Sequence, residues 1–155
     1  MTVLLRRLRE TDLDRVAALE ARCHESPWTR GQFADSLAAG HLAWVLEDGR
    51  RLLGYLVAMV GVDEMHLLDI TIDPARRGQG HARRLLTELA DACRAARAPL
   101  LWLEVREGNA AARRLYEAWG FEPLGRRKGY YARADGGRED ALVMRWVVRA
   151  DEEAA

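Results

Sequence analysis

The sequence predicts an α/β fold in which a mixed, mostly antiparallel sheet of about seven strands is flanked by about four helices. Three observations favour this class. Strand-like and helix-like patterns follow one another in the order β-α-α-β-β-β-α-β-α-β-β. Residues 67–94 read as a buried strand, a basic glycine-rich turn and a long helix. The 155 residues can bury one core, so we expect a single domain over residues 1–150.

The first half of the chain is predicted to form a strand, two helices and a hairpin. Thr11 is a suitable N-cap for the first helix. Thr29 and Gln32 have the spacing of a capping box, which opens a second, shorter helix. Asp48-Gly49 is a strong hairpin signal. The expected ranges are 3–8 for the strand, 11–23 and 29–37 for the helices, and 41–47 and 51–60 for the hairpin strands.

The next segment combines a strand over residues 64–72 with a helix that begins near Ala82. The strand is rich in apolar and β-branched residues, and Asp73-Pro74 ends it because proline cannot donate to a ladder. Apolar residues then recur at helical spacing as far as Cys93 and form one apolar face. Between strand and helix lies the basic, glycine-rich run over residues 76–80.

This order of strand, glycine-rich turn and helix suits the capture of an anion. The first turn of a helix leaves amide N–H groups without partners, and the helix dipole adds positive potential there. Glycines let a phosphate approach the backbone, and Arg76, Arg77 and Arg83 add charge around it. A plain tight turn is the alternative, because neither a P-loop nor the full G-x-G-x-x-G spacing is present.

The second half is predicted to add one strand, one helix and two final strands. The strand over residues 99–106 follows a crossover helix, so it should run parallel to the strand before it. Asn109 caps the helix over residues 110–119, and Gly120 ends it in a left-handed conformation. The final strands are expected over 121–127 and 141–148, with a loop over 132–140 between them and a frayed tail over 151–155.

The composition argues against several classes of protein. The 24 Lys and Arg balance 24 Asp and Glu, so we expect neither direct nucleic-acid binding nor attraction to a membrane surface. The chain lacks a long apolar run and a secretory signal, which leads us to expect a soluble, cytoplasmic monomer. Cys23 and Cys93 match no disulfide or metal-ligand spacing, so we expect reduced thiols on helices and no metal.

Glu104 is a carboxylate within an otherwise apolar strand, where it shares a face with Trp102 and Arg106. Trp102 could partly desolvate this carboxylate and raise its pKa toward neutrality, as a general base requires. A solvated or salt-bridged strand residue is the alternative. Glu64 and His66 begin the preceding strand, where either could serve as a base or take part in an ion pair.

Tyr116 and Asn109 are further candidates on the helix that follows. Tyr116 is either a core aromatic residue or a general acid that protonates a departing thiolate. Asn109 is most simply an N-cap. Among the histidines, His24 and His41 are expected at the surface, and His81 is expected to face solvent.

A resemblance to a known family gives these candidates specific roles. The run over residues 77–82, Arg-Gly-Gln-Gly-His-Ala, resembles the Q/R-x-x-G-x-G/A motif of the GNAT N-acetyltransferase superfamily, and the order of elements is similar over essentially the whole chain. The resemblance implies acetyl-CoA as co-substrate and a splay between the two central parallel strands. The implied cofactor-binding residues are Ile70, Thr71, Ile72, Arg77, Gly78, Gln79, Gly80, His81, Ala82, Arg83, Asn109 and Tyr116.

Within that superfamily the chain resembles the bacterial ribosomal-protein-alanine N-acetyltransferases (RimI type). The resemblance is carried by residues 101–106, 109–112, 115–117, 120–121, 130–131 and 137–141. It implies that Glu104 is the general base and Tyr116 the general acid. It also implies acceptor-binding positions at Pro27, Trp28, Tyr130 and Tyr131, although Trp28 could instead belong to the core.

The implied partner is the N-terminus of a small-subunit ribosomal protein, whose terminal alanine amine would receive the acetyl group. An α-amine has a pKa of about 7.7–8.0 and a lysine amine one of about 10.4, so a single carboxylate could deprotonate the first more readily. Acetylation of a lysine or of a small-molecule amine is the first alternative. A non-catalytic acyl-CoA-binding module is the second, and the presence of both a base and an acid argues against it.

Overall fold

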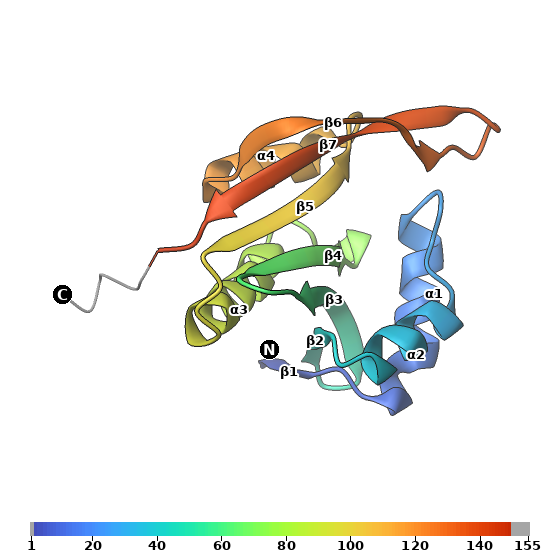
Figure 1. Cartoon of the computed structure of the whole chain (residues 1–155). Helices are drawn as coiled ribbons and strands as arrows, with labels where there is room; N and C mark the ends of the chain where they lie inside the picture. The colour runs from blue at the N-terminus through green and yellow to red at the C-terminus, as the bar shows by residue number, and fades with distance from the viewer. Residues whose placement is uncertain (1, 150–155) are drawn as a thin grey trace. The chain divides into compact units, whose positions relative to one another are not determined.

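The computed structural model describes residues 2–149 and contains seven strands and four α-helices within them (Figure 1). The strands are β1 (Val3–Arg7), β2 (Leu42–Asp48), β3 (Arg51–Val60), β4 (Glu64–Ile72), β5 (Leu100–Arg106), β6 (Glu122–Ala132) and β7 (Arg138–Val147). The helices are α1 (Leu13–Cys23), α2 (Arg30–Ala38), α3 (His81–Ala95) and α4 (Ala110–Trp119). They confirm the predicted fold class. Within the described residues, no helix is long and apolar enough to cross a membrane.

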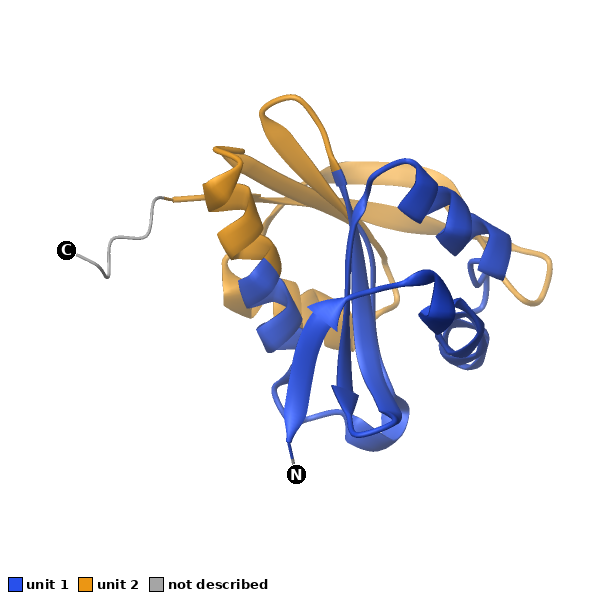
Figure 2. Cartoon of the chain, turned by 90° about the horizontal axis from the view of Figure 1, so that it is seen from below, with its two compact units in different colours: residues 1–59, 68–88 blue, residues 60–67, 89–155 orange. Residues whose placement is uncertain are grey.

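The strands form one mixed sheet in the order β1-β2-β3-β4-β5-β7-β6. The contacts of the chain group into two compact units (Figure 2): unit 1 comprises residues 1–59 and 68–88, and unit 2 comprises residues 60–67 and 89–155. The single domain over residues 1–150 remains a prediction. The expected tail over residues 151–155 lies outside the described residues.

In unit 1, α1 and α2 cover one face of the strands, and the first part of α3 lies on the other face (Figure 2). Side chains alternate along a strand, so Val45 of β2 and Tyr55 of β3 can face the same pair of helices. Phe33 of α2 meets Tyr55 edge-on, with 5.7 Å between the ring centroids. The buried core on this face consists of Leu8, Leu13, Val16, Leu19, Phe33, Ala43, Val45, Tyr55 and Val57.

In unit 2, the end of α4 packs against β7. Trp119 near the end of α4 meets Trp146 of β7, with 5.6 Å between the ring centroids. Asn109 caps the helix by accepting a hydrogen bond from the Ala112 amide at 3.2 Å. Gly120 follows the last turn with φ of 121°. Both predicted helix ends are therefore confirmed.

The parallel ladder between β4 and β5 is short. It joins Glu64 to Leu100 at one end and Leu67 to Leu103 at the other. Beyond Leu67, β4 continues to Ile72 without further register partners on β5, and β5 continues to Arg106 paired with β7. The predicted central parallel pair is thus confirmed, and its ladder covers only the first part of β4.

The predicted cap of the first helix is wrong. Residues Glu10–Asp12 form a short 3₁₀ turn ahead of α1, so Thr11 lies inside this turn. The side chain of Asp12, rather than that of Thr11, accepts a hydrogen bond from the Arg9 amide at 2.8 Å. Asp12 precedes α1 without a side-chain capping hydrogen bond, so the helix is entered through the 3₁₀ turn rather than at a capping side chain.

The predicted loop between the last two strands is also wrong in its length. β6 and β7 extend to Ala132 and Arg138, which leaves only residues 133–137 as the connection. Most β6 side chains are exposed, so this strand lacks the apolar alternation that marks a half-buried strand. The guanidinium of Arg138 donates to the Gly129 carbonyl at 2.9 Å and helps to hold the two strands together.

Asp12 is the centre of an ion-pair network at the base of α1 in unit 1. Arg6 donates two hydrogen bonds to its carboxylate at 2.8 and 2.9 Å, and Arg15 donates a third at 2.9 Å. Both arginines also bind Glu47 of β2. Burial alone would raise the pKa of Asp12, but the hydrogen bonds from Arg6, the Arg9 amide and Arg15 outweigh it and hold this pKa well below its usual value.

We predict that Asp12→Asn lowers the free energy of unfolding at pH 7 by about 3 kcal/mol, because two arginines lose their buried partner. A carboxylate whose pKa is depressed by folding stabilises the protein above its unfolded pKa and loses that contribution as the pH falls. The variant should therefore lose less stability between neutral and acid pH than the native protein. Urea denaturation at several pH values measures both effects.

Asp14→Asn is the matched control, because the Asp14 side chain is 88% exposed and its ion pair with Arg30 lies at the surface. This change should alter the free energy of unfolding by less than about 0.5 kcal/mol. Equal stability of the two variants at pH 7 would contradict the structural importance of the Asp12 network.

Candidate functional site

The register of the parallel ladder brings Glu104, Trp102 and His66 together in unit 2. His66 is the register partner of Trp102, and their rings stack with 3.7 Å between centroids. Glu104 lies two residues beyond Trp102 on the same face of β5, immediately after the last ladder pair. As a result, Nε2 of His66 and Oε1 of Glu104 are hydrogen-bonded at 2.7 Å.

The second oxygen of Glu104 faces a cation. Nε of Arg127, on β6, lies 3.4 Å from Oε2, and the Glu104 side chain is only 8% exposed. The carboxylate is therefore ion-paired, as the structural alternative expected. It is also held in one orientation by partners on two other strands, which is what a general base needs. The sequence named His66 as a candidate, but this contact could only be predicted once the ladder register was known.

Tyr116 and Asn109 occupy the places in α4 that their structural interpretations predict. The Tyr116 ring is buried and packs edge-on against Phe121, with 5.6 Å between centroids. Asn109 is the helix N-cap. A catalytic role for the Tyr116 hydroxyl, or a cofactor contact by Asn109, would come in addition to these packing and capping roles.

Two tyrosines of β6 lie close to the Glu104 pair. The guanidinium of Arg127, which faces Glu104, also lies over the Tyr130 ring at 5.6 Å. Tyr130 and Tyr131 meet edge-on at 4.9 Å, and Arg106 lies over the Tyr131 ring at 4.5 Å. Burial and the negative charge of Glu104 raise the pKa of Tyr131 above its usual value, so its hydroxyl stays protonated. Both tyrosines therefore border the candidate base.

The glycine-rich turn lies in unit 1 and has the geometry of an anion site. Asp73 accepts a hydrogen bond from the Ala75 amide at 3.0 Å and starts a short 3₁₀ turn ahead of the glycines. Gly78 and Gly80 have φ of 75° and 82°, a left-handed conformation that side chains disfavour. A Cβ added to either glycine would meet no atom within 4 Å. Open space therefore lies beside the backbone at the start of α3.

One prediction about this turn is wrong. His81 was expected to face solvent, but it is buried, and its Nε2 lies 3.1 Å from Oε1 of Gln79. The hydrogen bond fixes two residues of the turn to each other. His81 still begins α3, so its amide belongs to the first turn, where amide donors have no partner within the helix.

The strand before this turn contains a buried side chain that is hydrogen-bonded within the protein. Thr71 is buried, and its hydroxyl donates to Asp69 at 2.8 Å. On the β3 side the strands approach closely, because a Cβ at Gly54 would lie 2.5 Å from the Thr71 carbonyl oxygen. Trp28 is half-buried and its ring lies 5.1 Å from that of Phe33, whereas Pro27 is exposed.

Unit 1 contains a buried polar cluster that was not predicted from the sequence. Glu20 and His24 of the α1 segment face Asp69 of β4, and their ligand atoms lie within 4.8 Å of one another, a spacing that a metal ion could use. His24 was expected at the surface but is partly buried and contacts Thr71 at 2.8 Å. The signals were an acidic and a histidine residue four apart on one helix and a carboxylate within an apolar strand.

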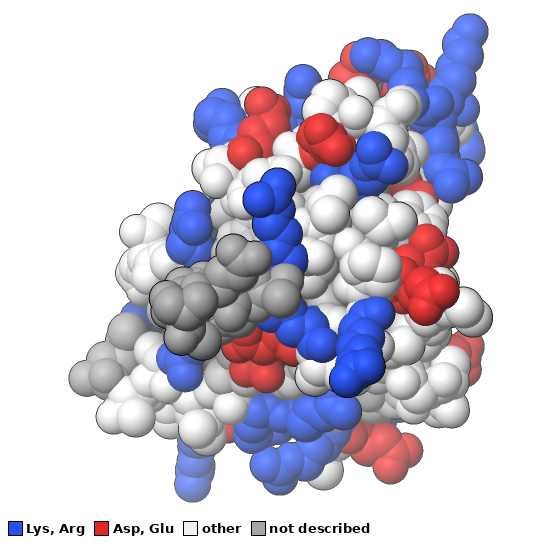
Figure 3. Space-filling view, turned by 60° about the vertical axis from the view of Figure 1, so that its left-hand side comes forward, with Lys and Arg blue, Asp and Glu red and all other residues white. Residues whose placement is uncertain are grey.

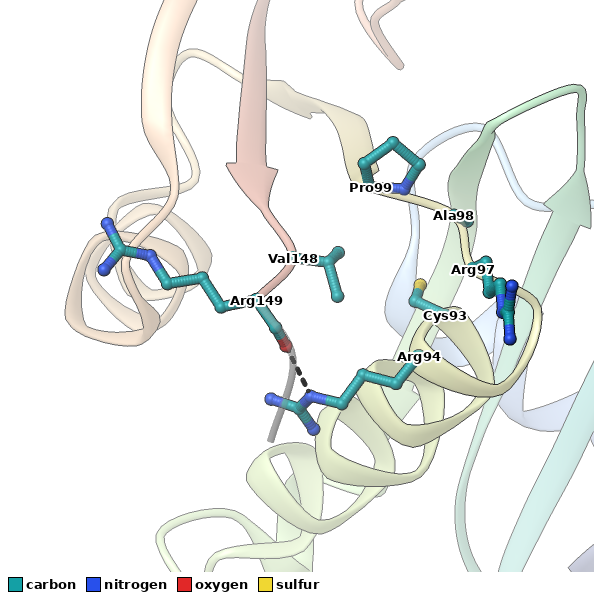
Figure 4. A pocket seen from close by; sticks show the side chains of 7 residues that line it. All are labelled: Cys93, Arg94, Arg97, Ala98, Pro99, Val148 and Arg149. Atoms are coloured by element: carbon teal, nitrogen blue, oxygen red, sulfur yellow. Dashed lines mark hydrogen bonds between the residues drawn. The ribbon is translucent and has the colours of Figure 1, made fainter. Parts of the chain in front are cut away.

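A pocket of about 390 Å³ lies at the end of α3 in unit 2 (Figure 4). It is lined by Cys93, Arg94, Arg97, Ala98, Pro99, Val148 and Arg149. Arg94 spans its edge and donates to the Arg149 carbonyl at 2.9 Å. Burial raises the pKa of the Cys93 thiol to about 11, so this cysteine is poorly suited to act as a nucleophile. The pocket includes none of the predicted site residues.

The charged surface agrees with the balanced composition. On the face displayed in Figure 3, basic side chains are interspersed with acidic and uncharged ones. Several of these charges are paired: Arg126 binds Glu107 and Asp140, and Arg106 binds Glu139.

Comparison with known proteins identifies relatives over most of the chain. Residues 12–121 match the family model described as "Acetyltransferase (GNAT) family". The "[Ribosomal protein bS18]-alanine N-acetyltransferase" of Escherichia coli (strain K12) is 38% identical over 137 residues, which cover 88% of this chain and 92% of that protein.

Two solved structures have the same fold. The crystal structure of the ribosomal-protein-S18-alanine N-acetyltransferase from Escherichia coli matches with a TM-score of 0.88 and 34% identity, covering 99% of both chains. The crystal structure of Arabidopsis thaliana NAA60 in complex with acetyl-CoA matches with a TM-score of 0.84, covering 96% of this chain and 100% of that one. Its identity is only 18%, so it supports the fold alone.

Proposed function

Because the chain belongs to the acetyltransferase (GNAT) family, we propose that it moves the acetyl group of acetyl-CoA to the N-terminal alanine amine of ribosomal protein bS18. The observation that carries this proposal is the 38% identity, along nearly the whole chain, to the Escherichia coli enzyme that is named for this reaction. The position and partners of Glu104 support it independently.

The glycine-rich turn fits the pyrophosphate of CoA. Gly78 and Gly80 leave open space beside the start of α3, where the helix dipole and unpaired amides favour an anion. We assign the amides of residues 78–83 to the pyrophosphate and Arg77 and Arg83 to its charge. The backbone of residues 70–72 would pair with the pantetheine arm, since this part of β4 has no ladder partner on β5. Asn109 and Tyr116 complete the assigned contacts.

Acetyl-CoA supplies an activated thioester, and the protein has to manage two protons. Glu104 accepts a proton from the acceptor amine, directly or through a water molecule, as the amine nitrogen forms its bond to the acetyl carbon. Tyr116 gives a proton to the sulfur as the carbon–sulfur bond breaks. A backbone amide of residues 70–72 polarises the carbonyl oxygen. His66 and Arg127 orient the carboxylate and keep its negative charge paired.

A single carboxylate as the base favours an α-amine over a lysine amine as the acceptor. At neutral pH roughly a tenth of an α-amine is neutral, because its pKa is about 7.7–8.0, whereas far less of a lysine with a pKa of about 10.4 is neutral. One carboxylate is therefore enough for the first acceptor. Tyr130 and Tyr131 border Glu104, and we assign them, with Pro27 and Trp28, to the acceptor peptide.

We predict that a peptide beginning with alanine, with the N-terminal sequence of bS18, is acetylated at its α-amine. The same peptide with a blocked N-terminus and an added lysine should react at least about 100-fold more slowly, because its amine is almost fully protonated. Mass spectrometry locates the acetyl group, and a thiol assay follows the release of CoA. Faster reaction of the blocked, lysine-bearing peptide would replace the proposed acceptor with the alternative one.

Glu104→Gln should lower kcat by about 100-fold or more, because the amide keeps the shape of the side chain but cannot accept the proton. Tyr116→Phe should also lower kcat, while its buried ring keeps the packing against Phe121. Both variants should bind acetyl-CoA with nearly native affinity in calorimetry. Glu122→Gln is the control, because this side chain is 60% exposed and should leave kcat unchanged. Native turnover in both site variants would exclude the mechanism.

Gly80→Ala should weaken the binding of acetyl-CoA by about tenfold or more, because the new methyl group occupies space that we assign to the pyrophosphate. The left-handed backbone adds about 1 kcal/mol of strain. Gly49→Ala carries the same strain, at φ of 60° in the β2–β3 turn, also with no atom within 4 Å of the added Cβ. It should therefore lose similar stability and keep native affinity. Equal affinities of the two variants would exclude this phosphate site.

A further inference from the structure

Glu20 and Asp69 form a buried carboxylate pair between α1 and β4 in unit 1. Glu20 is 2% exposed, and the Asp69 side chain is 6% exposed. Two adjacent carboxylates cannot both remain ionised in a buried site without a large cost, and this cost favours a proton held between them. In agreement, burial, the hydrogen bond to Glu20 and the negative charge of Glu20 raise the pKa of Asp69 well above its usual value.

Glu20 holds the segment that follows α1. Its Oε2 accepts a hydrogen bond from the Trp28 amide at 3.1 Å, and its Oε1 accepts one from the Tyr55 hydroxyl of β3 at 2.8 Å. Trp28 lies in the Pro27-Trp28 segment that we assign to the acceptor peptide. The carboxylate of Glu20 therefore fixes the backbone of this segment to β3.

Asp69 links the same carboxylate to the strand assigned to the pantetheine arm. Thr71 donates its hydroxyl proton to Asp69 at 2.8 Å, and Nε2 of His24 lies 2.8 Å from the Thr71 oxygen. Because Thr71 has one hydroxyl proton, His24 must donate its Nε2 proton to Thr71. The contacts thus run from Thr71, which lies within residues 70–72, through Asp69 and Glu20 to the Trp28 amide.

We propose that the proton shared by Glu20 and Asp69 ties the Pro27-Trp28 segment, assigned to the acceptor, to residues 70–72, assigned to the pantetheine arm. Glu20 and Asp69 are positioning residues in this account, since they act through Trp28 and Thr71. The inference rests on the proposed function, because that function assigns the two segments to acceptor and cofactor. It adds that both segments are aligned by one buried, proton-dependent contact.

The partners of the cluster favour this role over a metal site. Both oxygens of Glu20 accept hydrogen bonds from Tyr55 and Trp28, and both His24 Nε2 and Asp69 Oδ1 are bonded to Thr71. Each of these atoms, which would have to coordinate a cation, therefore already has a hydrogen-bond partner in the protein. Replacing the pair by apolar residues would avoid the cost of burying a charge, but it would leave the Trp28 amide and the Tyr55 hydroxyl without acceptors.

The first test compares two changes at one position. Asp69→Asn keeps the contact, because the amide can donate to Glu20 and accept from Thr71 without a titrating proton. Asp69→Leu has a similar size and removes both hydrogen bonds. We expect Asp69→Leu to raise the KM for the bS18 peptide about tenfold, with kcat changed less than threefold. Asp69→Asn should restore a KM within about twofold of native.

The pH profile separates a shared proton from simple packing. The titratable groups that face the pair are His24 at the end of α1 and Tyr55 on β3, and the pKa of Tyr55 is itself raised by burial and by the two carboxylates. As the pH rises through the raised pKa of Asp69, the native pair loses its proton and its two charges repel. The ratio of peptide KM, native over Asp69→Asn, should therefore rise at alkaline pH, because the introduced amide carries no titrating proton while both proteins share every other group.

Hydrogen exchange of the amides in residues 24–29 tests the contact without any substrate. Asp69→Leu should speed exchange of the Trp28 amide at least about tenfold, and Asp69→Asn should not. If Asp69→Leu fails to fold, Asp69→Ala takes its place. Native exchange rates in the apolar variant would overturn the inference. So would a flat KM ratio across pH, or Zn²⁺ stabilisation of the native protein that is lost in Asp69→Asn.

If the proposed function is wrong, the experiments give a different result from the one expected if only the shared-proton contact is wrong. In that case the native protein would acetylate no N-terminal peptide, while the exchange rates of residues 24–29 would still distinguish the two Asp69 variants. A native enzyme that acetylates the peptide, with unchanged exchange in Asp69→Leu, would instead remove only the shared-proton contact.

Discussion

The early end of the parallel ladder between β4 and β5 is the constraint on which the site depends. The ladder stops at the pair Leu67–Leu103, so Glu104 is the first residue of β5 beyond it. In the preceding pair the rings of His66 and Trp102 stack, and the His66 imidazole is hydrogen-bonded to the Glu104 carboxylate. The same ending leaves the backbone of residues 70–72 without partners on β5. The register of this short ladder thus accounts for the position of the Glu104 carboxylate beside His66.

The chain holds two buried carboxylate sites that are stabilised in opposite ways. Glu104 is hydrogen-bonded to His66 and ion-paired with Arg127, and these two contacts hold its carboxylate in one orientation. Asp69 faces another carboxylate, Glu20, and burial together with this neighbour raises the pKa of Asp69 well above its usual value. The first arrangement suits proton transfer during a reaction. The second suits a fixed contact, because the raised pKa of Asp69 favours a proton held between the two carboxylates.

Local signals predicted most of the fold, whereas contacts between residues far apart in the sequence were not predictable. The Thr29–Gln32 capping box and the Asn109 cap depend on neighbouring residues and were found from spacing alone. The His66–Glu104 hydrogen bond joins residues 38 positions apart and depends on register. The Glu20–Asp69 contact depends on how α1 packs on β4. The β6–β7 hairpin was underestimated because its side chains are largely exposed and show no apolar alternation.

A crystal structure with a bisubstrate ligand, in which CoA is joined to the α-amine of a bS18 peptide, tests the central claim most directly. The account predicts the pyrophosphate on the amides of residues 78–83 and the pantetheine arm along residues 70–72. It also predicts the acceptor nitrogen within hydrogen-bonding reach of Glu104, directly or through one water. A pyrophosphate bound elsewhere, or a Glu104 carboxylate with no such path to the acceptor nitrogen, would contradict it.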